Sequence, residues 1–179
     1  FPWHVRVNNM NALNTHDTPR FKSYTLDGAQ RVAAGMQFTF PGIPVVWAGD
    51  EFGLDGFNGE KSRTPIPWND ERPSDRSMIE TYAQLAAMRK QHPALVDGSM
   101  RFVFADSDTL IYVRESKKER LIVLATRGRT GDVKIAPDAI PGLASAKLIY
   151  GKAKIIVGKK KAHFEAAKMT FAVWHLPAA

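Results

Sequence analysis

The side chains best suited to chemistry stand near the start of the chain, in Asn14-Thr15-His16-Asp17-Thr18-Pro19-Arg20. A carboxylate follows an imidazole directly, and Pro19 stops any strand that leads into them. Strands of α/β barrels present catalytic side chains in this way, at the carboxyl end where each strand meets its loop. The competing interpretation of Asp17 is a turn residue, because Asp before Thr-Pro is good turn chemistry.

A strand and a helix before a second strand should position this pair. Residues 10–14 predict a short strand, residues 25–40 a helix, and residues 43–48 a continuous apolar strand covered on both faces. The helix should place one face inward, formed by Ala29, Val32, Ala33, Met36 and Phe40. A sheet with so few β/α units cannot close, so we expect most of the barrel to lie upstream of residue 1.

A long loop, residues 49–76, separates these elements from a second helix. The loop is rich in Gly, Pro, Asn and Asp, and loops of this length in compact domains are often functional. Ser77 and Glu80 fit a capping box at the start of the helix, which should end before Pro93. Its buried face should contain Met78, Tyr82, Leu85 and Met88.

The pattern changes to short strands with tight turns after about residue 98. The predicted strands are residues 101–104, 109–113, 121–124, 132–135, 147–150, 154–157, 162–165 and 170–174. Consecutive strands of this kind are typical of an antiparallel β-sandwich. The fold class is therefore α/β plus all-β, with one domain over residues 1–95 and a second over residues 96–179.

Composition limits the partners and the compartment. The net charge of +7 lies largely in two short clusters, residues 117–120 and 159–161, which we interpret as solvated hairpin turns rather than as a nucleic-acid surface. No apolar run approaches the roughly 20 residues of a membrane span. The absence of cysteine fits a reducing compartment such as the cytoplasm without deciding the location.

Four motifs in this order resemble the α-amylase family of glycoside hydrolases. The His16-Asp17 segment resembles the family's fourth conserved region, and residues 41–53 resemble its last barrel strand with the ending Gly-Asp-Glu-x-Gly. Arg63 to Trp68 resembles the following loop, and residues 89–95 the close of the last barrel helix. The resemblance implies that residues 1–95 are the last two β/α units of a TIM (β/α)8 barrel.

The resemblance also implies a retaining hydrolase of α-glucosidic bonds in starch- or maltodextrin-type glucans. Asp17 matches the carboxylate that stabilises the transition state, and His16 matches a sugar-binding histidine. Arg63 matches an arginine that contacts sugars in some members. Arg20 is a further substrate-binding candidate, although a solvated arginine is an equal alternative. The nucleophile and the general acid would come from strands absent here, so the chain alone should be inactive.

Some residues depart from the family pattern or allow a structural interpretation. An Asp often stands four residues before the matched arginine, but Gly59 occupies that position and Glu60 lies beside it. Asp50 and Glu51 should tie loops through backbone N–H groups rather than touch substrate. The aromatic rings of Trp47 and Trp68 could stack on sugars, but tryptophans of this kind are more often buried in a core.

Other classes of function remain open. A carbohydrate-binding module would need an exposed row of aromatic residues on the sandwich, and a silent relative of the same fold would lack the upstream catalytic residues. A metal-dependent phosphohydrolase would need further His and Asp on helices. We expect no cofactor and no metal, because His4, His92, His163 and His175 show no ligand spacing. The expected partners are an α-glucan or oligosaccharide and the upstream barrel portion.

Overall fold

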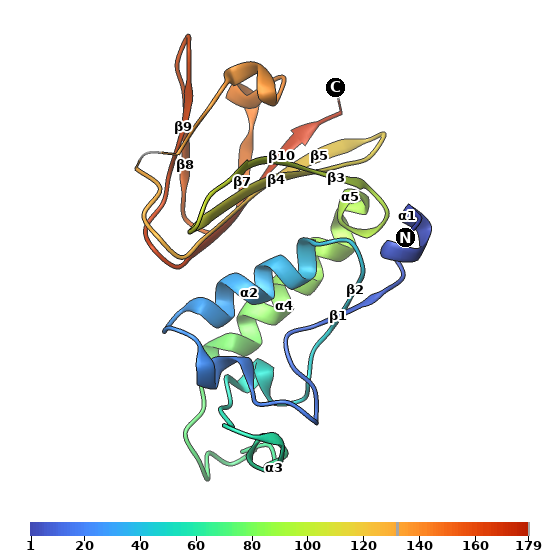
Figure 1. Cartoon of the computed structure of the whole chain (residues 1–179), viewed down its shortest axis with the longest axis vertical. Coiled ribbons are helices and arrows are strands. Elements are labelled where there is room, and N and C mark those ends of the chain that lie inside the picture. The colour runs from blue at the N-terminus through green and yellow to red at the C-terminus, as the bar shows by residue number, and fades with distance from the viewer. Residues whose placement is uncertain (132, 179) are drawn as a thin grey trace.

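Figure 1 shows the computed structural model, which describes residues 1–131 and 133–178. Two helices, α2 (Ala29–Thr39) and α4 (Ser77–Gln91), lie against one face of a five-stranded sheet, and a three-stranded sheet covers its other face. The loop that carries α3 (Gly59–Ser62) lies at the end of the molecule farthest from the sheets. The candidate site is at this end, on the helical side.

The N-terminal part holds the helices and one small parallel sheet. In this sheet, β1 (Met10–Ala12) pairs with β2 (Ile43–Val45), and the register places Met10 opposite Ile43. Four shorter helical elements complete this part: α1 (Trp3–Arg6), η1 (Phe21–Tyr24), η2 (Asp50–Phe52) and α5 (Pro93–Val96). The helix α2 connects the two parallel strands, as in a β/α unit.

All strands of the C-terminal part pair in antiparallel fashion. The five-stranded sheet has the order β3 (Ser99–Ala105), β4 (Thr109–Glu115), β5 (Glu119–Thr126), β10 (Thr170–Pro177) and β7 (Lys147–Tyr150). The three-stranded sheet has the order β6 (Lys134–Ile135), β9 (Ala162–Glu165) and β8 (Lys154–Val157). Two 3-10 helices, η3 (Pro137–Ala139) and η4 (Leu143–Ser145), lie between β6 and β7.

Two hydrophobic cores lie on opposite faces of the five-stranded sheet. On one face, Leu121 and Val123 of β5 belong to the core formed with α2 and α4. On the other face, Ile122 and Leu124 belong to the core shared with the three-stranded sheet. Every residue of β5 is therefore buried. This explains why residues 121–125 are an unbroken apolar run although the sheet is antiparallel.

The predicted strands are confirmed, with bounds that differ by a few residues. The predicted strand 132–135 is shorter, because β6 spans Lys134–Ile135 and Asp132 lies outside the described residues. Lys117 and Lys118 lie at the turn between β4 and β5, and residues 159–161 lie at the turn between β8 and β9, as expected. Glu119 and Arg120 of the first cluster correct the expectation, since they are buried in β5. The first helix begins four residues later than predicted, since Gly28 adopts φ +81 immediately before Ala29.

The buried face of α2 differs from the prediction. Of the five residues expected inside, Val32 is buried, whereas Ala29, Ala33, Met36 and Phe40 are only partly buried. Ala34 and Phe38, which were not predicted, are buried against α4 and the sheet. Gly35 lies so close to Phe171 that a Cβ would approach the ring to 2.3 Å. The helix packs on its neighbours through a small-residue face, which periodicity of large apolar residues does not reveal.

The capping box predicted for α4 is wrong. Ser77 lies inside the helix and its hydroxyl donates to the Asp75 carboxylate, which also accepts from the Ser77 backbone N–H. Asp75 forms an ion pair with Arg31 of α2 at 2.9 Å. The start of α4 is therefore fixed by a carboxylate two residues earlier, which serves both helices. The predicted buried residues of α4 are confirmed, as is its end before Pro93.

The division into domains at residues 95 and 96 stays a prediction. That position falls inside α5, and the core on the helical side joins α2 and α4 to β4, β5 and β10. Among the residues described, no helix has both the length and the apolar character needed to cross a membrane.

Candidate active site

The His16-Asp17 pair lies in a tight turn beyond β1. The Thr18 backbone N–H donates to the Thr15 carbonyl at 3.2 Å, and the Thr15 N–H donates to the Thr18 hydroxyl at 2.9 Å. His16 Nε2 lies 3.1 Å from Asp17 Oδ2, and the two side chains are 61% and 72% exposed. Asp17 therefore lies in a turn, as the alternative interpretation expected. This does not exclude a functional role, because the turn leaves the side chains of His16 and Asp17 exposed.

A buried ion pair supports this turn from beneath. Arg20 Nη1 lies 2.8 Å from Asp50 Oδ1, and the two side chains are 1% and 4% exposed. The Arg20 guanidinium also donates to the carbonyls of Ala48 and Ser62, at 2.7 and 2.8 Å from Nη2. One side chain therefore ties together the loops that follow β1 and β2 and the end of α3.

Arg20 occupies a different position from the one we expected for a substrate-binding residue. Its described contacts are with Asp50, backbone carbonyls and the Trp47 ring, and its side chain is almost entirely buried. Direct contact with a sugar stays a prediction for this residue. The geometry itself supports a positioning role beneath the rim.

Burial raises the pKa of Asp50, although hydrogen bonds from Asn14 and Arg20 partly oppose the shift. The Asn14 amide donates to both carboxylate oxygens, at 3.2 and 3.1 Å, and its carbonyl oxygen accepts from the Phe21 N–H at 2.9 Å. Gly49 allows the close approach, since it adopts φ +104 and a Cβ there would lie 2.7 Å from Arg20 Nη2. Asp50 therefore ties loops as expected, but through the Asn14 and Arg20 side chains rather than through backbone N–H groups.

Glu51 has the same structural role by a different contact. Its carboxylate accepts from the Gly49 backbone N–H at 2.8 Å. The Gln30 side chain of α2 donates to the Asp50 carbonyl at 3.0 Å, which anchors η2 to the helix. The end of the second parallel strand is therefore held from both sides, which keeps the rim above it in place.

The segment that contains α3 forms the neighbouring wall of the rim. Arg63 pairs with Glu60 and donates to the His16 carbonyl at 3.4 Å. A Cβ on Gly59 would lie 3.5 Å from the Asp17 carbonyl oxygen, so the helix start lies directly against the turn. Glu60, beside Gly59, is therefore the acidic partner of Arg63 in this wall.

The two tryptophans near the rim are not core residues in this structure. Trp68 is 70% exposed and contacts the edge of Phe52, which corrects the expectation of burial. Trp47 is half-buried, with its ring 6.0 Å from the His16 ring and the Arg20 guanidinium 5.9 Å from its own centroid. The Trp47 ring therefore lies close to both the His16 ring and the Arg20 guanidinium.

Sequence reasoning missed Asn14 as a functional support. It belongs to the same motif as His16 and Asp17, but its amide type suggested no charge chemistry. The signal that could have identified it is its place at the end of β1, opposite the end of β2 in the parallel pair. The carboxyl ends of parallel strands meet at one edge, so Asn14 and Asp50 are brought together.

Comparisons with known proteins find relatives among α-amylase-type enzymes. Residues 3–74 match the family model described as alpha amylase, catalytic domain. The chain is 34% identical over 122 residues to Alpha-amylase 2 of Dictyoglomus thermophilum, covering 63% of this chain and 21% of that protein. It is 31% identical over 131 residues to a cyclomaltodextrinase of Geobacillus thermopakistaniensis, covering 71% of this chain and 22% of that protein.

The fold has known counterparts over almost its whole length. The debranching enzyme from Nostoc punctiforme superposes with a TM-score of 0.83 over 98% of this chain and 37% of that chain, at 22% identity. The chain spans about a fifth of the length of the curated relatives named above. In sequence and in fold, it resembles the C-terminal part of an α-amylase-family glycoside hydrolase.

Proposed function

We propose that this chain is the C-terminal part of a retaining glycoside hydrolase that cleaves α-glucosidic bonds in starch- or maltodextrin-type glucans. The observation that carries the proposal is the exposed His16-Asp17 pair at the carboxyl end of a parallel strand, within the residues that match the catalytic-domain model. In this proposal, residues 1–95 supply the last two β/α units of a TIM barrel, and residues 96–179 form the β-sandwich domain behind it.

Asp17 is the proposed transition-state support. Cleavage of a glycosidic bond passes through an oxocarbenium-like state in which positive charge develops on the sugar ring. A carboxylate held in place before the reaction stabilises this charge and accepts hydrogen bonds from sugar hydroxyls. The turn at residues 15–18 supports that placement, because two hydrogen bonds between Thr15 and Thr18 hold the backbone that carries Asp17.

His16 and Arg63 are the proposed sugar contacts on either side of Asp17. An N–H of the His16 ring can donate to a sugar hydroxyl. The Arg63 guanidinium, 42% exposed, has donors beyond those used by Glu60 and the His16 carbonyl. Arg20, which we first considered for substrate binding, acts in this proposal through Asp50 on the shape of the rim.

A carbohydrate-binding module is less well supported. Among the described residues of the two antiparallel sheets, the one strongly exposed aromatic side chain is Phe102, at 56%. A module that binds glucans on a sheet needs several rings in a row, because each sugar ring stacks on its own aromatic face.

The isolated chain should have no hydrolytic activity. A retaining enzyme needs a nucleophilic carboxylate and an acid roughly 5–5.5 Å apart. Within the proposal, both come from the upstream barrel portion. Purified chain incubated with maltooligosaccharides should release no reducing ends, and turnover by the chain would contradict the proposed division of the site.

The role of Asp17 is tested in the full-length parent enzyme with Asp17→Asn. The substitution retains the size of the side chain and removes its charge. The chemical step should slow by roughly a hundredfold or more, since one preorganised electrostatic group commonly contributes that much. Single-turnover measurements with a maltooligosaccharide separate this step from binding.

Asp55→Asn is the matched control, because Asp55 is an exposed carboxylate in the long loop after β2, 3.6 Å from Arg72. This variant should keep the parental rate. Equal rates for parental enzyme and the Asp17→Asn variant would exclude the proposed role, while a parent enzyme without activity would favour the silent relative.

A further inference from the structure

Polar residues interrupt the apolar face of the five-stranded sheet at one end. On the side that faces the helices, the alternation of β5 runs through Ala125, Val123 and Leu121 to Glu119. On β10, the corresponding row runs through Val173 to His175, which pairs with Leu121, and then to Pro177, which pairs with Glu119. Glu119 and His175 are therefore diagonal neighbours on one face of the sheet, where apolar residues would continue the core.

A third polar residue comes from the helical layer. His92 lies between α4 and α5, and its Nδ1 atom is 2.7 Å from Glu119 Oε2. His175 Nε2 is 3.3 Å from the same oxygen. The ligand atoms of the three residues all lie within 4.8 Å of one another. The other oxygen, Glu119 Oε1, accepts from the Ala94 backbone N–H at 3.2 Å, which fixes the plane of the carboxylate.

Burial makes this cluster unusual. The Glu119 side chain is 8% exposed, and its ionic contacts in the described part of the chain are the two histidines alone. Lys117 and Lys118 precede it in the chain but are exposed. A buried carboxylate is normally paired with a cation or bound to a metal. Two imidazoles with ring nitrogens directed at one buried carboxylate oxygen are compatible with both arrangements, pairing with a cation and binding of a metal.

We propose that His92, Glu119 and His175 form a zinc-binding site. Two imidazole nitrogens and one carboxylate oxygen are a ligand set that Zn²⁺ takes in proteins, with bonds of about 2.0–2.2 Å. Tetrahedral ligands at that bond length lie roughly 3.3 Å apart, so small side-chain rotations suffice to bring these atoms to the metal. Mg²⁺ and Ca²⁺ prefer oxygen ligands and fit the set poorly.

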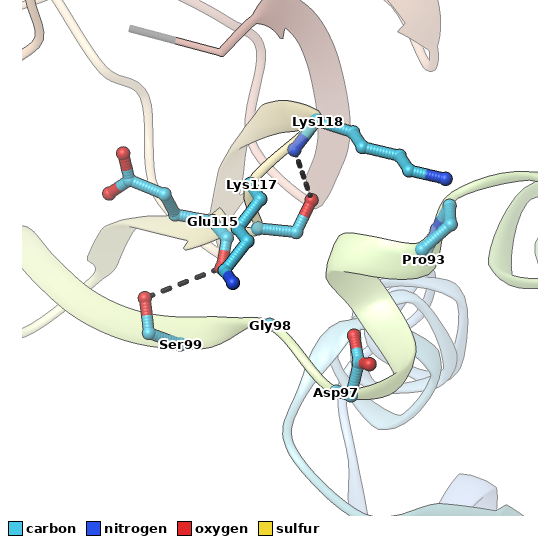
Figure 2. Close-up of a pocket in the computed structure, with 8 residues that line it drawn as sticks. Pro93, Asp97, Gly98, Ser99, Glu115, Lys117 and Lys118 are labelled. Atoms are coloured by element: carbon cyan, nitrogen blue, oxygen red, sulfur yellow. Dashed lines mark hydrogen bonds between the residues drawn. The ribbon is translucent and has the colours of Figure 1, made fainter.

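Solvent reaches the cluster, which provides an entry path and a fourth ligand. The His175 side chain is 33% exposed and the His92 side chain 18%. Figure 2 shows the adjacent cleft, which lies between α5 and the turn that joins β4 to β5. Pro93 and Lys118 line it, and these residues are the chain neighbours of His92 and Glu119. The three cluster residues do not line this cleft themselves, so the exposed parts of His175 and His92 are where water can supply the fourth ligand.

A bound ion would connect three elements that the chain otherwise joins only by packing and hydrogen bonds. His92 belongs to the helical layer, Glu119 starts β5, and His175 lies near the end of β10. Zinc bound to the folded state alone stabilises that state by mass action. The site would therefore hold the helical layer against the sheet, far from the rim that carries Asp17.

The proposal is tested by titrating ZnCl2 into the metal-free 179-residue chain in a calorimeter, with excess MgCl2 present. We expect saturable binding of one equivalent and a higher midpoint of thermal unfolding at saturation. His92→Gln and His175→Gln should each weaken binding by at least about tenfold, which is the loss seen when metal-site residues are altered. His163→Gln, on β9 of the other sheet, is the matched control and should bind as the parental chain does.

Absence of saturable binding in the parental chain would overturn the proposal and leave a hydrogen-bonded triad without metal. Equal affinity in the His92 and His175 variants would overturn it too, since the ion would then bind elsewhere. If a histidine variant fails to fold, X-ray absorption of the parental chain with one equivalent of Zn²⁺ decides instead. Two imidazoles and oxygen ligands support the site, and any other imidazole count excludes it.

Discussion

Two acid-base pairs lie at the same end of this molecule and differ in almost every physical respect. His16 and Asp17 lie 3.1 Å apart, with side chains 61% and 72% exposed. Arg20 and Asp50 lie 2.8 Å apart, with side chains 1% and 4% exposed. The exposed pair has few contacts besides its own turn, whereas the buried pair reaches several backbone carbonyls and an asparagine.

The difference shows how a rim of functional groups is built. An exposed ion pair contributes little to stability, about 0–1 kcal/mol, so its residues are free to serve another purpose. A buried pair cannot lose one partner cheaply, because the remaining charge then stays without solvent or a counter-ion. The buried residues hold the rim in place, and the exposed residues are available to a ligand.

The largest expected effect is on the buried pair. Asp50→Ala leaves the Arg20 guanidinium buried and without its carboxylate, and should lower the free energy of unfolding by about 3–5 kcal/mol. Urea denaturation followed by circular dichroism measures this change. A decrease in this free energy of less than about 1 kcal/mol, the range found for exposed pairs, would show that the buried pair is no more important for stability than the exposed pair.

Arg114 is a buried charge whose described hydrogen bonds go to carbonyl groups instead of a carboxylate, so it tests how much such a charge contributes to stability. Its side chain is fully buried and donates to the carbonyls of Thr39, Leu95, Gly98 and Ser99, which lie at the ends of α2 and α5 and the start of β3. Burial lowers the pKa of Arg114 to about 10.

Arg114→Met retains most of the volume but leaves these carbonyls without a donor. The free energy of unfolding should fall by about 2–4 kcal/mol, measured by urea denaturation. Arg101→Met, on the exposed start of β3, is the control and should change stability by less than about 0.5 kcal/mol. Equal effects of the two variants would show that the carbonyls find other partners.

Asp75 is an intermediate case, since it and Arg31 are both 40% exposed. Partial burial raises the pKa of Asp75, but hydrogen bonds from Ser77 and the charge of Arg31 more than offset this, so the pKa lies below 3.8. The folded state therefore favours the carboxylate. The resulting stability is present above the ordinary pKa and is lost as the pH falls through the lower folded-state value.

Asp75→Asn should reduce the dependence of stability on pH. As the pH falls from about 5 through the lower folded-state pKa, the parental chain progressively loses the contribution of Asp75, whereas the variant has none to lose. Urea denaturation across this range gives the two slopes. Parallel slopes would show that Asp75 titrates alike in the folded and unfolded states.

The smallest expected effect on stability is at the rim. Asp17→Asn should change the free energy of unfolding of the chain by less than about 0.5 kcal/mol, because the side chain is exposed and no core contact is lost. Urea denaturation of the same chain measures this value. A decrease in the free energy of unfolding of more than about 1 kcal/mol would show that Asp17 contributes to the stability of the fold.

The strands of the C-terminal part were the most predictable elements, because their side chains repeat locally. Strands β4 and β5 are dense in β-branched and aromatic residues and are bounded by polar turns. The face of α2 was not predictable in the same way. Its closest packing uses Ala34 and Gly35, and small residues give no amphipathic signal.

Part of the candidate site could be predicted from the sequence, and part could not. The His16-Asp17 pair is adjacent in sequence, so its chemistry and its end-of-strand position could be recognised directly. The role of Arg20 depends on Asp50 and Ser62, which are 30 and 42 residues away. The spacing of the histidines in the sequence predicts no metal site. The pairing of β5 with β10 and the end of α4 nevertheless bring His92, Glu119 and His175 together.

The amino-acid sequence by itself determined the local features: the strands, the helix ends at glycine and proline, and the two side chains displayed in one turn. These follow from backbone preferences and short-range periodicity. Only the tertiary structure decided which charged residues are buried and which partners they find. The reason is physical, because desolvation and pairing depend on what packs around a group, and those neighbours come from distant parts of the chain.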